Sequence, residues 1–275
     1  MSAPGAGLRP TRPPGGSSTV AEPHVLETDV LLRAHNVSRR FGGLVAVNGV
    51  SLELRRGAVH AVIGTNGAGK STLINILSGE LDASSGSVEL RGTDITRWSQ
   101  PRRARAGIGR SYQRTTIYPV FTVLENCRLA AQARHQRPWA WWTDAAACRV
   151  SVPAARDAVA RAGLADVQDR PAGTLSHGQR RQLEIAMCLA TGPEVLLLDE
   201  PLAGMGAEET ERMLALLNEL KAGHAIALVE HDMDAVFRIA DRITVMVNGA
   251  VLASDTPQAV QANAEVQAAY LGGTE

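Results

Sequence analysis

Cysteine, aromatic residues and lysine are all scarce in this chain of 275 residues. The three cysteines form no CxxC pair, which argues against a disulfide-stapled scaffold and fits a reducing compartment. Aromatic residues make up only 4%, so we expect a core built mainly from aliphatic side chains. Lysine occurs only as Lys70 and Lys221, so a lysine within a phosphate-binding pattern stands out.

A long apolar run and an excess of charge of one sign are also lacking. No stretch reaches 18 successive apolar residues, and the N-terminus has no apolar signal region, so we expect neither a membrane-spanning helix nor a secretion signal. The 28 basic residues balance the 28 acidic ones, which argues against a polycation that binds nucleic acid along its whole length. If the protein works at a membrane, we expect it to do so from the cytosolic side through a partner.

The order of apolar runs predicts one large α/β domain after a disordered tail. Residues 1–28 are rich in proline, glycine and serine, which predicts the tail, and residues 29–275 form the domain. Strands are predicted at 30–37, 45–54, 58–63, 87–90, 195–198, 225–229 and 242–247, and helices at 71–78, 177–190, 208–221 and 233–240. This alternation indicates a parallel sheet. The segment at about 114–172 is predicted to be a helical insertion, and residues 256–275 a C-terminal helical tail.

A glycine-rich segment predicts a phosphate-binding loop. Residues 64–71 fit the pattern G-x-x-x-x-G-K-[ST] and lie between an apolar strand and a helix. Its glycines let successive backbone N–H groups face one anion, and the helix adds its positive N-terminal end. We expect Lys70 to reach the β- and γ-phosphates and the Ser71 hydroxyl to hold Mg²⁺. The expected nucleotide-binding residues here are Gly64, Asn66, Gly67, Ala68, Gly69, Lys70, Ser71 and Thr72.

A buried strand that ends in two acids predicts the second half of the same site. Four apolar residues, 195–198, are followed directly by Asp199 and Glu200. Asp199 can complete the coordination of Mg²⁺, while Glu200, pointing in another direction, can polarise a water molecule.

Four motifs in a fixed order make the chain resemble the ATP-binding subunit of an ABC transporter, from about residue 30 to the C-terminus. They are the phosphate loop, the pentapeptide Leu175-Ser176-His177-Gly178-Gln179, the acidic strand end and Glu230-His231-Asp232. The resemblance implies a P-loop NTPase of the ABC-ATPase fold, with a parallel-sheet core, an antiparallel β subdomain and a helical subdomain. It further implies an ATP hydrolase that binds ATP and Mg²⁺ and works as a dimer with two nucleotides at its interface.

The resemblance also assigns roles to single residues. It implies that Lys70, Gln113, Glu200 and His231 are catalytic, with Glu200 as general base and His231 bonded to the γ-phosphate. Ser71, Gln113 and Asp199 are implied as Mg²⁺ ligands, and Phe41 as the aromatic that stacks on adenine. From the residues alone, Phe41 also fits an ordinary core position and Gln113 a surface glutamine.

The pentapeptide matches the family's signature motif, with a departure inside it and another nearby. The resemblance implies that Ser176, Gly178 and Gln179 bind the γ-phosphate of ATP on the other subunit. His177 replaces the glycine usual at the third position, and Gly206 falls where many relatives have an aspartate. Polar contacts across the dimer are therefore expected to differ from the common pattern.

Three segments resemble ATP-binding subunits of importers for hydrophobic, branched-chain amino acids: 105–115 followed by 122–126, 182–187 with 201–205, and 268–272. This implies coupling to integral-membrane permease subunits at the cytoplasmic face of the inner membrane, and indirectly to a periplasmic solute-binding protein. A sister ATPase as dimer partner is favoured, and a homodimer stays open. Relatives for urea, amides or aromatic acids share the pattern. The alternatives are an ATPase of lipopolysaccharide-type lipid export and a soluble ABC ATPase outside transport.

Two local features have more than one interpretation. Three tryptophans within residues 139–142 fit either a surface for the permease or lipid headgroups, or packing inside the helical part. The arginine-rich stretch 97–114 fits a solvated or permease-facing surface better than a nucleic-acid site. We expect no nucleic-acid partner.

Overall fold

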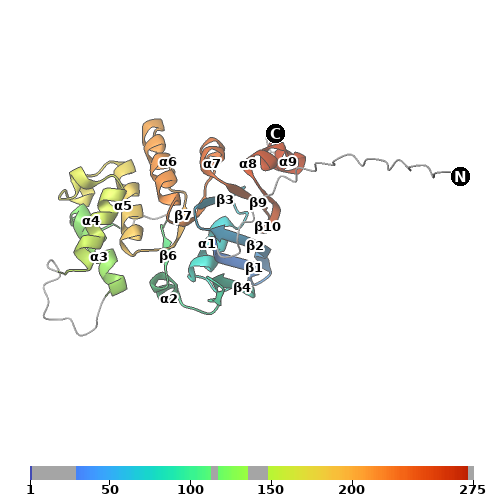
Figure 1. The fold of residues 1–275 in the computed structure, drawn as a ribbon, viewed down its shortest axis with the longest axis horizontal. Helices are drawn as coiled ribbons and strands as arrows, with labels where there is room; N and C mark the ends of the chain where they lie inside the picture. The colour runs from blue at the N-terminus through green and yellow to red at the C-terminus, as the bar shows by residue number, and fades with distance from the viewer. Residues whose placement is uncertain (2–28, 113–116, 136–147, 272–275) are drawn as a thin grey trace.

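The computed structural model describes residues 1, 29–112, 117–135 and 148–271. Within them, two sheets form the centre of the molecule. One has six strands in the order β10-β9-β3-β8-β7-β6, and the other has four in the order β2-β1-β4-β5. Helices α3, α4 and α5 gather at one end, and the four-stranded sheet lies at the opposite side of the six-stranded one (Figure 1). The described part thus has the α/β architecture predicted from the sequence.

The central strands of the six-stranded sheet, β3, β7 and β8, are short, apolar and buried on both faces, as parallel strands usually are. Only β10 runs antiparallel, paired to β9 as a hairpin. The strands are β3 (Ala58–Gly64), β6 (Ile108–Arg110), β7 (Val195–Asp199), β8 (Ala225–Val229), β9 (Arg242–Val247) and β10 (Ala250–Asp255).

The four-stranded sheet is antiparallel throughout and begins with a long hairpin. Gly42 and Gly43 form the turn of this hairpin, and Gly42 has φ +57°, a left-handed conformation that glycine adopts without strain. Helix α1 lies against both sheets and shares their buried core. The strands are β1 (Val30–Phe41), β2 (Leu44–Arg55), β4 (Ser85–Leu90) and β5 (Thr93–Asp94).

Nine α-helices and two short 3₁₀ turns lie within the described residues. Helices α3, α4 and α5 pack on one another around a core of alanine, leucine, valine and cysteine side chains. The α-helices are α1 (Lys70–Ser78), α2 (Gln100–Arg105), α3 (Val123–His135), α4 (Ser151–Arg161), α5 (His177–Ala190), α6 (Ala207–Lys221), α7 (Met233–Ile239), α8 (Pro257–Ala262) and α9 (Ala264–Leu271). No helix among these residues is long and apolar enough to cross a membrane.

The arginine-rich stretch corrects one expectation. It does not form a uniformly solvated surface, because it contains α2 and β6 and buries Arg103, which is 1% exposed. The Arg103 guanidinium donates to the carbonyl oxygens of Ile76 (2.8 Å), Leu77 (3.0 Å) and Thr96 (2.8 Å). Carbonyl groups at the end of α1 lack helical partners, so a buried five-donor group satisfies them here.

Candidate ATP-binding and hydrolysis site

Three adjacent parallel strands bring the predicted motifs to one edge of the sheet. Strand β8 lies between β3 and β7, and its last residue, Val229, pairs with Val62 of β3 and Asp199 of β7. The phosphate loop follows β3, the two acids end β7, and Glu230 and His231 follow β8 (Figure 1). Segments more than 160 residues apart in sequence therefore meet, as expected for the carboxyl ends of parallel strands.

Close backbone contacts hold the phosphate loop against neighbouring strands. A Cβ atom at Gly64 would lie 2.3 Å from the carbonyl oxygen of Met246, and one at Gly69 would lie 2.2 Å from that of Ala46. Only glycine fits at either position. Asn66 and Gly67 form the exposed crest, Ala68 is buried, and Ser71 and Thr72 lie in the first turn of α1. Among the described residues no side chain caps α1 and no acid lies in its first turn, so its first N–H groups suit a phosphate.

Lys70 is folded back into the loop. Its Nζ donates to the carbonyl oxygens of Gly64 (2.7 Å) and Thr65 (3.1 Å), and the residue is 8% exposed. Burial lowers the pKa of Lys70, and the charges of Glu200 and Asp199 oppose that shift. The charges of the lysine and the two acids therefore act on one another.

Asp199 is a buried acid with an oxygen left unpaired. Its backbone N–H donates to the Ser111 hydroxyl (3.2 Å), but its Oδ1 has no hydrogen-bond partner among the described residues. Burial raises the pKa of Asp199, while Arg110, a hydrogen bond with Ser71 and Lys70 lower it. An orphaned, buried carboxylate oxygen beside a serine hydroxyl is the kind of donor set that Mg²⁺ prefers, so these residues fit that ion.

Glu200 is turned away from the strand direction by its backbone. It has φ +51°, a left-handed conformation that is rare for a residue with a side chain, and its N–H donates to the Val229 carbonyl (2.9 Å). Such local strain persists only where the surroundings impose it, and it is common at functional sites. The chain thus presents two neighbouring acids in different directions.

Glu230 is a further part of this site, to which the sequence motifs assign no role of its own. The residue is 1% exposed, and its carboxylate accepts from the N–H groups of Leu202 (2.8 Å) and His231 (3.2 Å). Burial raises the pKa of Glu230, while the hydrogen bonds from those two N–H groups lower it. Glu230 ties the segment after β7 to the one after β8 and fixes the backbone that presents His231, whose side chain is 64% exposed. An acid directly after an apolar strand was the available signal.

The signature pentapeptide forms the start of α5. Ser176 is its N-cap: the Ser176 hydroxyl accepts from the Gln179 N–H (3.2 Å), and the Gln179 side chain accepts from the Ser176 N–H (3.1 Å). This capping box explains why Ser176 and Gln179 are three positions apart. The Ser176 hydroxyl and the Gly178 N–H also contact α6, where both donate to the Glu209 carboxylate.

The histidine inside the signature is matched by a glycine in the segment after Glu200. The Nε2 atom of His177 lies 3.0 Å from the Ala203 carbonyl oxygen. A Cβ atom at Gly204, which has φ +76°, would lie 3.1 Å from that same Nε2. His177 therefore depends on a small, left-handed residue across from it, and it links the signature to the segment between β7 and α6.

Of two further predicted site residues, the structure describes Phe41 but not Gln113. Phe41 ends β1 and is 43% exposed, so it is not a core residue; the Arg39 guanidinium lies 4.8 Å from the centre of its ring. An exposed ring at a hairpin end is available for stacking. Gln113 lies outside the described residues, as do the tryptophans of 139–142.

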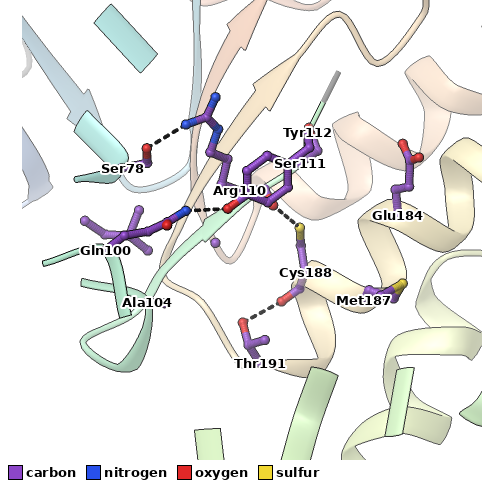
Figure 2. Close-up of a pocket in the computed structure, with 12 residues that line it drawn as sticks. Ser78, Gln100, Ala104, Arg110, Ser111, Tyr112, Glu184, Met187, Cys188 and Thr191 are labelled. Atoms are coloured by element: carbon purple, nitrogen blue, oxygen red, sulfur yellow. Dashed lines mark hydrogen bonds between the residues drawn. The ribbon is translucent and has the colours of Figure 1, made fainter. Parts of the chain in front are cut away.

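A pocket of about 200 Å³ lies between the sheet and α5. It is the pocket before Gln113, because Tyr112, which lines it, directly precedes Gln113 in the sequence. Figure 2 shows Gln100 and Tyr112 joined by a hydrogen bond, and Cys188 donating to the Arg110 carbonyl (2.8 Å). Burial raises the pKa of Cys188 to about 12, so this thiol stays protonated. The lining residues come from the end of α1, from α2, from β6 and the two residues after it, and from α5 and its C-cap.

Comparison with known families decides what kind of protein carries this site. The sequence profile described as ABC transporter matches residues 47–203, more than half of the chain. The chain belongs to the ABC transporter family. It is therefore a transport ATPase that binds and hydrolyses ATP, and family membership implies a membrane permease and a dimer of ATPase subunits. A second profile, described as branched-chain amino acid ATP-binding cassette transporter, matches residues 250–275.

Similar proteins align over most of the chain. The high-affinity branched-chain amino acid transport ATP-binding protein BraF of Pseudomonas aeruginosa is 38% identical over 255 residues, covering 88% of this chain and 98% of BraF. The high-affinity branched-chain amino acid transport ATP-binding protein LivG of Salmonella typhimurium is 40% identical over 250 residues, covering 88% of this chain and 98% of LivG. A nucleotide-free ATP-binding cassette from an ABC transporter aligns with TM-score 0.79 and 31% identity, covering 88% of this chain and 98% of that one. An ADP-bound cassette aligns with TM-score 0.78.

Proposed function

We propose that this ABC ATPase powers the import of branched-chain, hydrophobic amino acids. The observation that carries this proposal is the alignment with branched-chain amino acid transport ATPases over 98% of their length. The C-terminal profile match supports it independently, because it covers a segment outside the nucleotide-binding motifs. The ATPase subunit does not touch the cargo, so the cargo is inferred by analogy with these relatives.

The geometry supports one nucleotide site made by this chain. In this proposal the backbone N–H groups of the phosphate loop and Lys70 hold the phosphates, and Phe41 stacks on adenine. Ser71, Asp199 and Gln113 hold Mg²⁺, which would neutralise phosphate charge when bound. Support for the ion comes from the unpaired Oδ1 of Asp199.

Hydrolysis requires a base that is close to the phosphates and faces away from the metal ligands. Glu200 meets this requirement, because its left-handed backbone turns it away from Asp199 and its charge still acts on Lys70. We assign it the role of general base, taking a proton from the attacking water. His231 and Gln113 complete the site by contacting the γ-phosphate and the water, and Glu230 positions the backbone of His231.

The signature residues serve the other half of a dimer. Ser176, Gly178 and Gln179 would bind the γ-phosphate of ATP held by the partner subunit, and that subunit is a sister ATPase rather than a second copy. A hydroxyl and an N–H group at a helix N-terminus suit such an anion. The dimer would lie at the cytoplasmic face of the inner membrane, held by the permease, with a periplasmic solute-binding protein supplying the cargo.

The pocket before Gln113 is the proposed docking point for a cytoplasmic segment of the permease. It joins β6 of the sheet to α5, so a bound segment would contact both parts of the ATPase. Tyr112, which lines the pocket, directly precedes in sequence the residue assigned to the metal and the water. A shift at this pocket would therefore reach the nucleotide site over very few residues.

The first test combines one substitution with recovery of partners. Glu200→Gln should lower ATP turnover by about 10²- to 10⁴-fold and leave ATP binding intact, because it removes the base and keeps the side-chain shape. Glu219→Gln, an exposed acid on α6, is the matched control and should turn over ATP like the wild type. Unchanged turnover in Glu200→Gln would remove Glu200 from the role of base.

The same variant can report the transport system. Tagged Glu200→Gln protein, purified from detergent-solubilised membranes with ATP, should recover two multi-span permeases and a second ATPase, identified by mass spectrometry. The companion solute-binding protein should then bind leucine in preference to urea or amides. Recovery of lipid-transport components would contradict import, and recovery with ribosomes or DNA alone would contradict the role in transport.

A further inference from the structure

The anion-binding end of α5 already holds an anion from its own chain. The Glu209 Oε1 atom accepts from the Ser176 hydroxyl (3.2 Å) and from the Gly178 N–H (3.1 Å). A Cβ atom at Gly178 would lie 2.6 Å from the Glu209 carboxyl carbon, so the glycine is also what lets this carboxylate approach. Glu209 belongs to the first turn of α6, 31 positions after Gly178.

This contact conflicts with the use of the same donors for a phosphate. One hydroxyl and one N–H cannot serve a carboxylate and a phosphoryl oxygen together, and the two anions repel each other at this distance. We propose that Glu209 is the residue that sets how much ATP is needed to close the dimer, because it occupies the signature site until the partner subunit's γ-phosphate displaces it. This inference rests on the proposed role of Ser176 and Gly178.

The surroundings of Glu209 offer it a second position. A cavity of about 270 Å³ adjoins the signature and is lined by Ser176, Gln179, Glu209 and Arg212 among others. Arg212 follows Glu209 by three positions on α6, the spacing at which helical side chains meet. It now pairs with Glu208 (3.2 Å), an exposed and therefore weak interaction. The displaced Glu209 carboxylate would pair with Arg212, which prevents a second repulsion with the incoming phosphate.

Two roles of Glu209, competition with the phosphate and stabilisation of the start of α5, lead to opposite expectations. If Glu209 competes with the phosphate, neutralising it should lower the ATP concentration that gives half the maximal rate. If it only stabilises the start of α5, neutralising it should raise that concentration and lower the melting temperature. The sign of the change in KM therefore separates the two roles.

The experiment measures ATPase rates against ATP concentration in the complex purified through a tag on this chain. Glu209→Gln should lower the KM for ATP by roughly threefold or more, with kcat changed less than twofold. Glu211→Gln is the matched control, because Glu211 lies on the same helix and pairs with Arg238 instead; its KM should equal that of the wild type. Arg212→Ala should raise the KM, which provides a test if Glu209→Gln is unstable.

A KM for Glu209→Gln that is unchanged or higher would overturn the inference, as would a KM for Arg212→Ala at or below that of the wild type. Lys70→Ala serves to separate this outcome from failure of the proposed function. If ATPase activity survives Lys70→Ala, the nucleotide site itself is misassigned. If Lys70→Ala abolishes activity and Glu209→Gln behaves like Glu211→Gln, only the role of Glu209 fails.

Discussion

Asp199 and Glu200 are neighbours at the end of β7, but their surroundings differ. Burial raises the pKa of Asp199 and leaves one oxygen unpaired, whereas the left-handed backbone at Glu200 points the next acid elsewhere. The sequence predicts both acids, because four apolar residues followed by two acids define a strand end. It does not predict that Glu230 accepts from Leu202, because that contact joins residues 28 positions apart.

The buried side chain of His60 makes the stability of the fold depend on pH. It is 4% exposed in β3, with Nδ1 2.9 Å from the Glu53 carbonyl oxygen and Nε2 2.7 Å from the Thr244 hydroxyl. Burial lowers its pKa from 6.5 to about 4. The unfolded chain therefore binds the proton more readily, so the stabilisation is present above pH 6.5 and is lost as pH falls toward 4. Over that whole window the loss is about 3 kcal/mol.

Urea unfolding at pH 7.5 and at pH 5 measures this contribution. Between those values the wild type should lose about 2 kcal/mol more than His60→Gln, because about 1.5 pH units of the window are crossed. His35→Gln, an exposed histidine on β1, is the control and should follow the wild type. Equal losses in His60→Gln and the wild type would show that His60 is not responsible.

Helices and strands with a clear apolar pattern or a capping motif could be predicted from the sequence. The helix 177–190 and the strands 225–229 and 242–247 agree with α5, β8 and β9 at both ends. Ser176 and Gln179 mark the start of α5, β8 is an uninterrupted apolar run, and β9 is apolar except at Arg242 and Thr244. Strands β6 and β10 and helix α2 were missed, because they are short and partly polar. The position of β6 depends on a partner distant in sequence, because β6 pairs with β7.

Arg103 of α2 stabilises the end of α1, the helix that follows the phosphate loop. Arg103→Met should lower the free energy of unfolding by about 2–4 kcal/mol, because it removes the buried hydrogen bonds that the guanidinium donates to the carbonyl groups of Ile76 and Leu77. Urea unfolding measures the loss. Arg105→Met, an exposed position on the same helix, should change it by less than about 0.5 kcal/mol. Similar losses in the two variants would contradict the role of Arg103 at the end of α1.

In the whole molecule, helix α5 contacts both the segment after the acidic strand end and strand β6. The sequence motifs do not show that one helix makes both contacts. His177 of α5 contacts Ala203, and Cys188 of α5 contacts Arg110 of β6. The motifs name residues on each side of these contacts, but only the fold shows that α5 carries both. Movement of α5 relative to the sheet would therefore act on the signature and on the pocket before Gln113 at once.

This arrangement predicts that filling the pocket separates ATP binding from the permease. Ala104 lines the pocket from α2 and is exposed, so Ala104→Trp would fill the space without disturbing the core. Recovery of the permease with the tagged protein should fall by about tenfold or more, equivalent to about 1.4 kcal/mol of binding, while binding of fluorescent ATP stays unchanged. Ala215→Trp, an exposed position on α6 away from the pocket, should recover the permease fully. Equal recovery with both variants would place the permease elsewhere, and lost ATP binding in Ala104→Trp would mean that the pocket serves the nucleotide site instead.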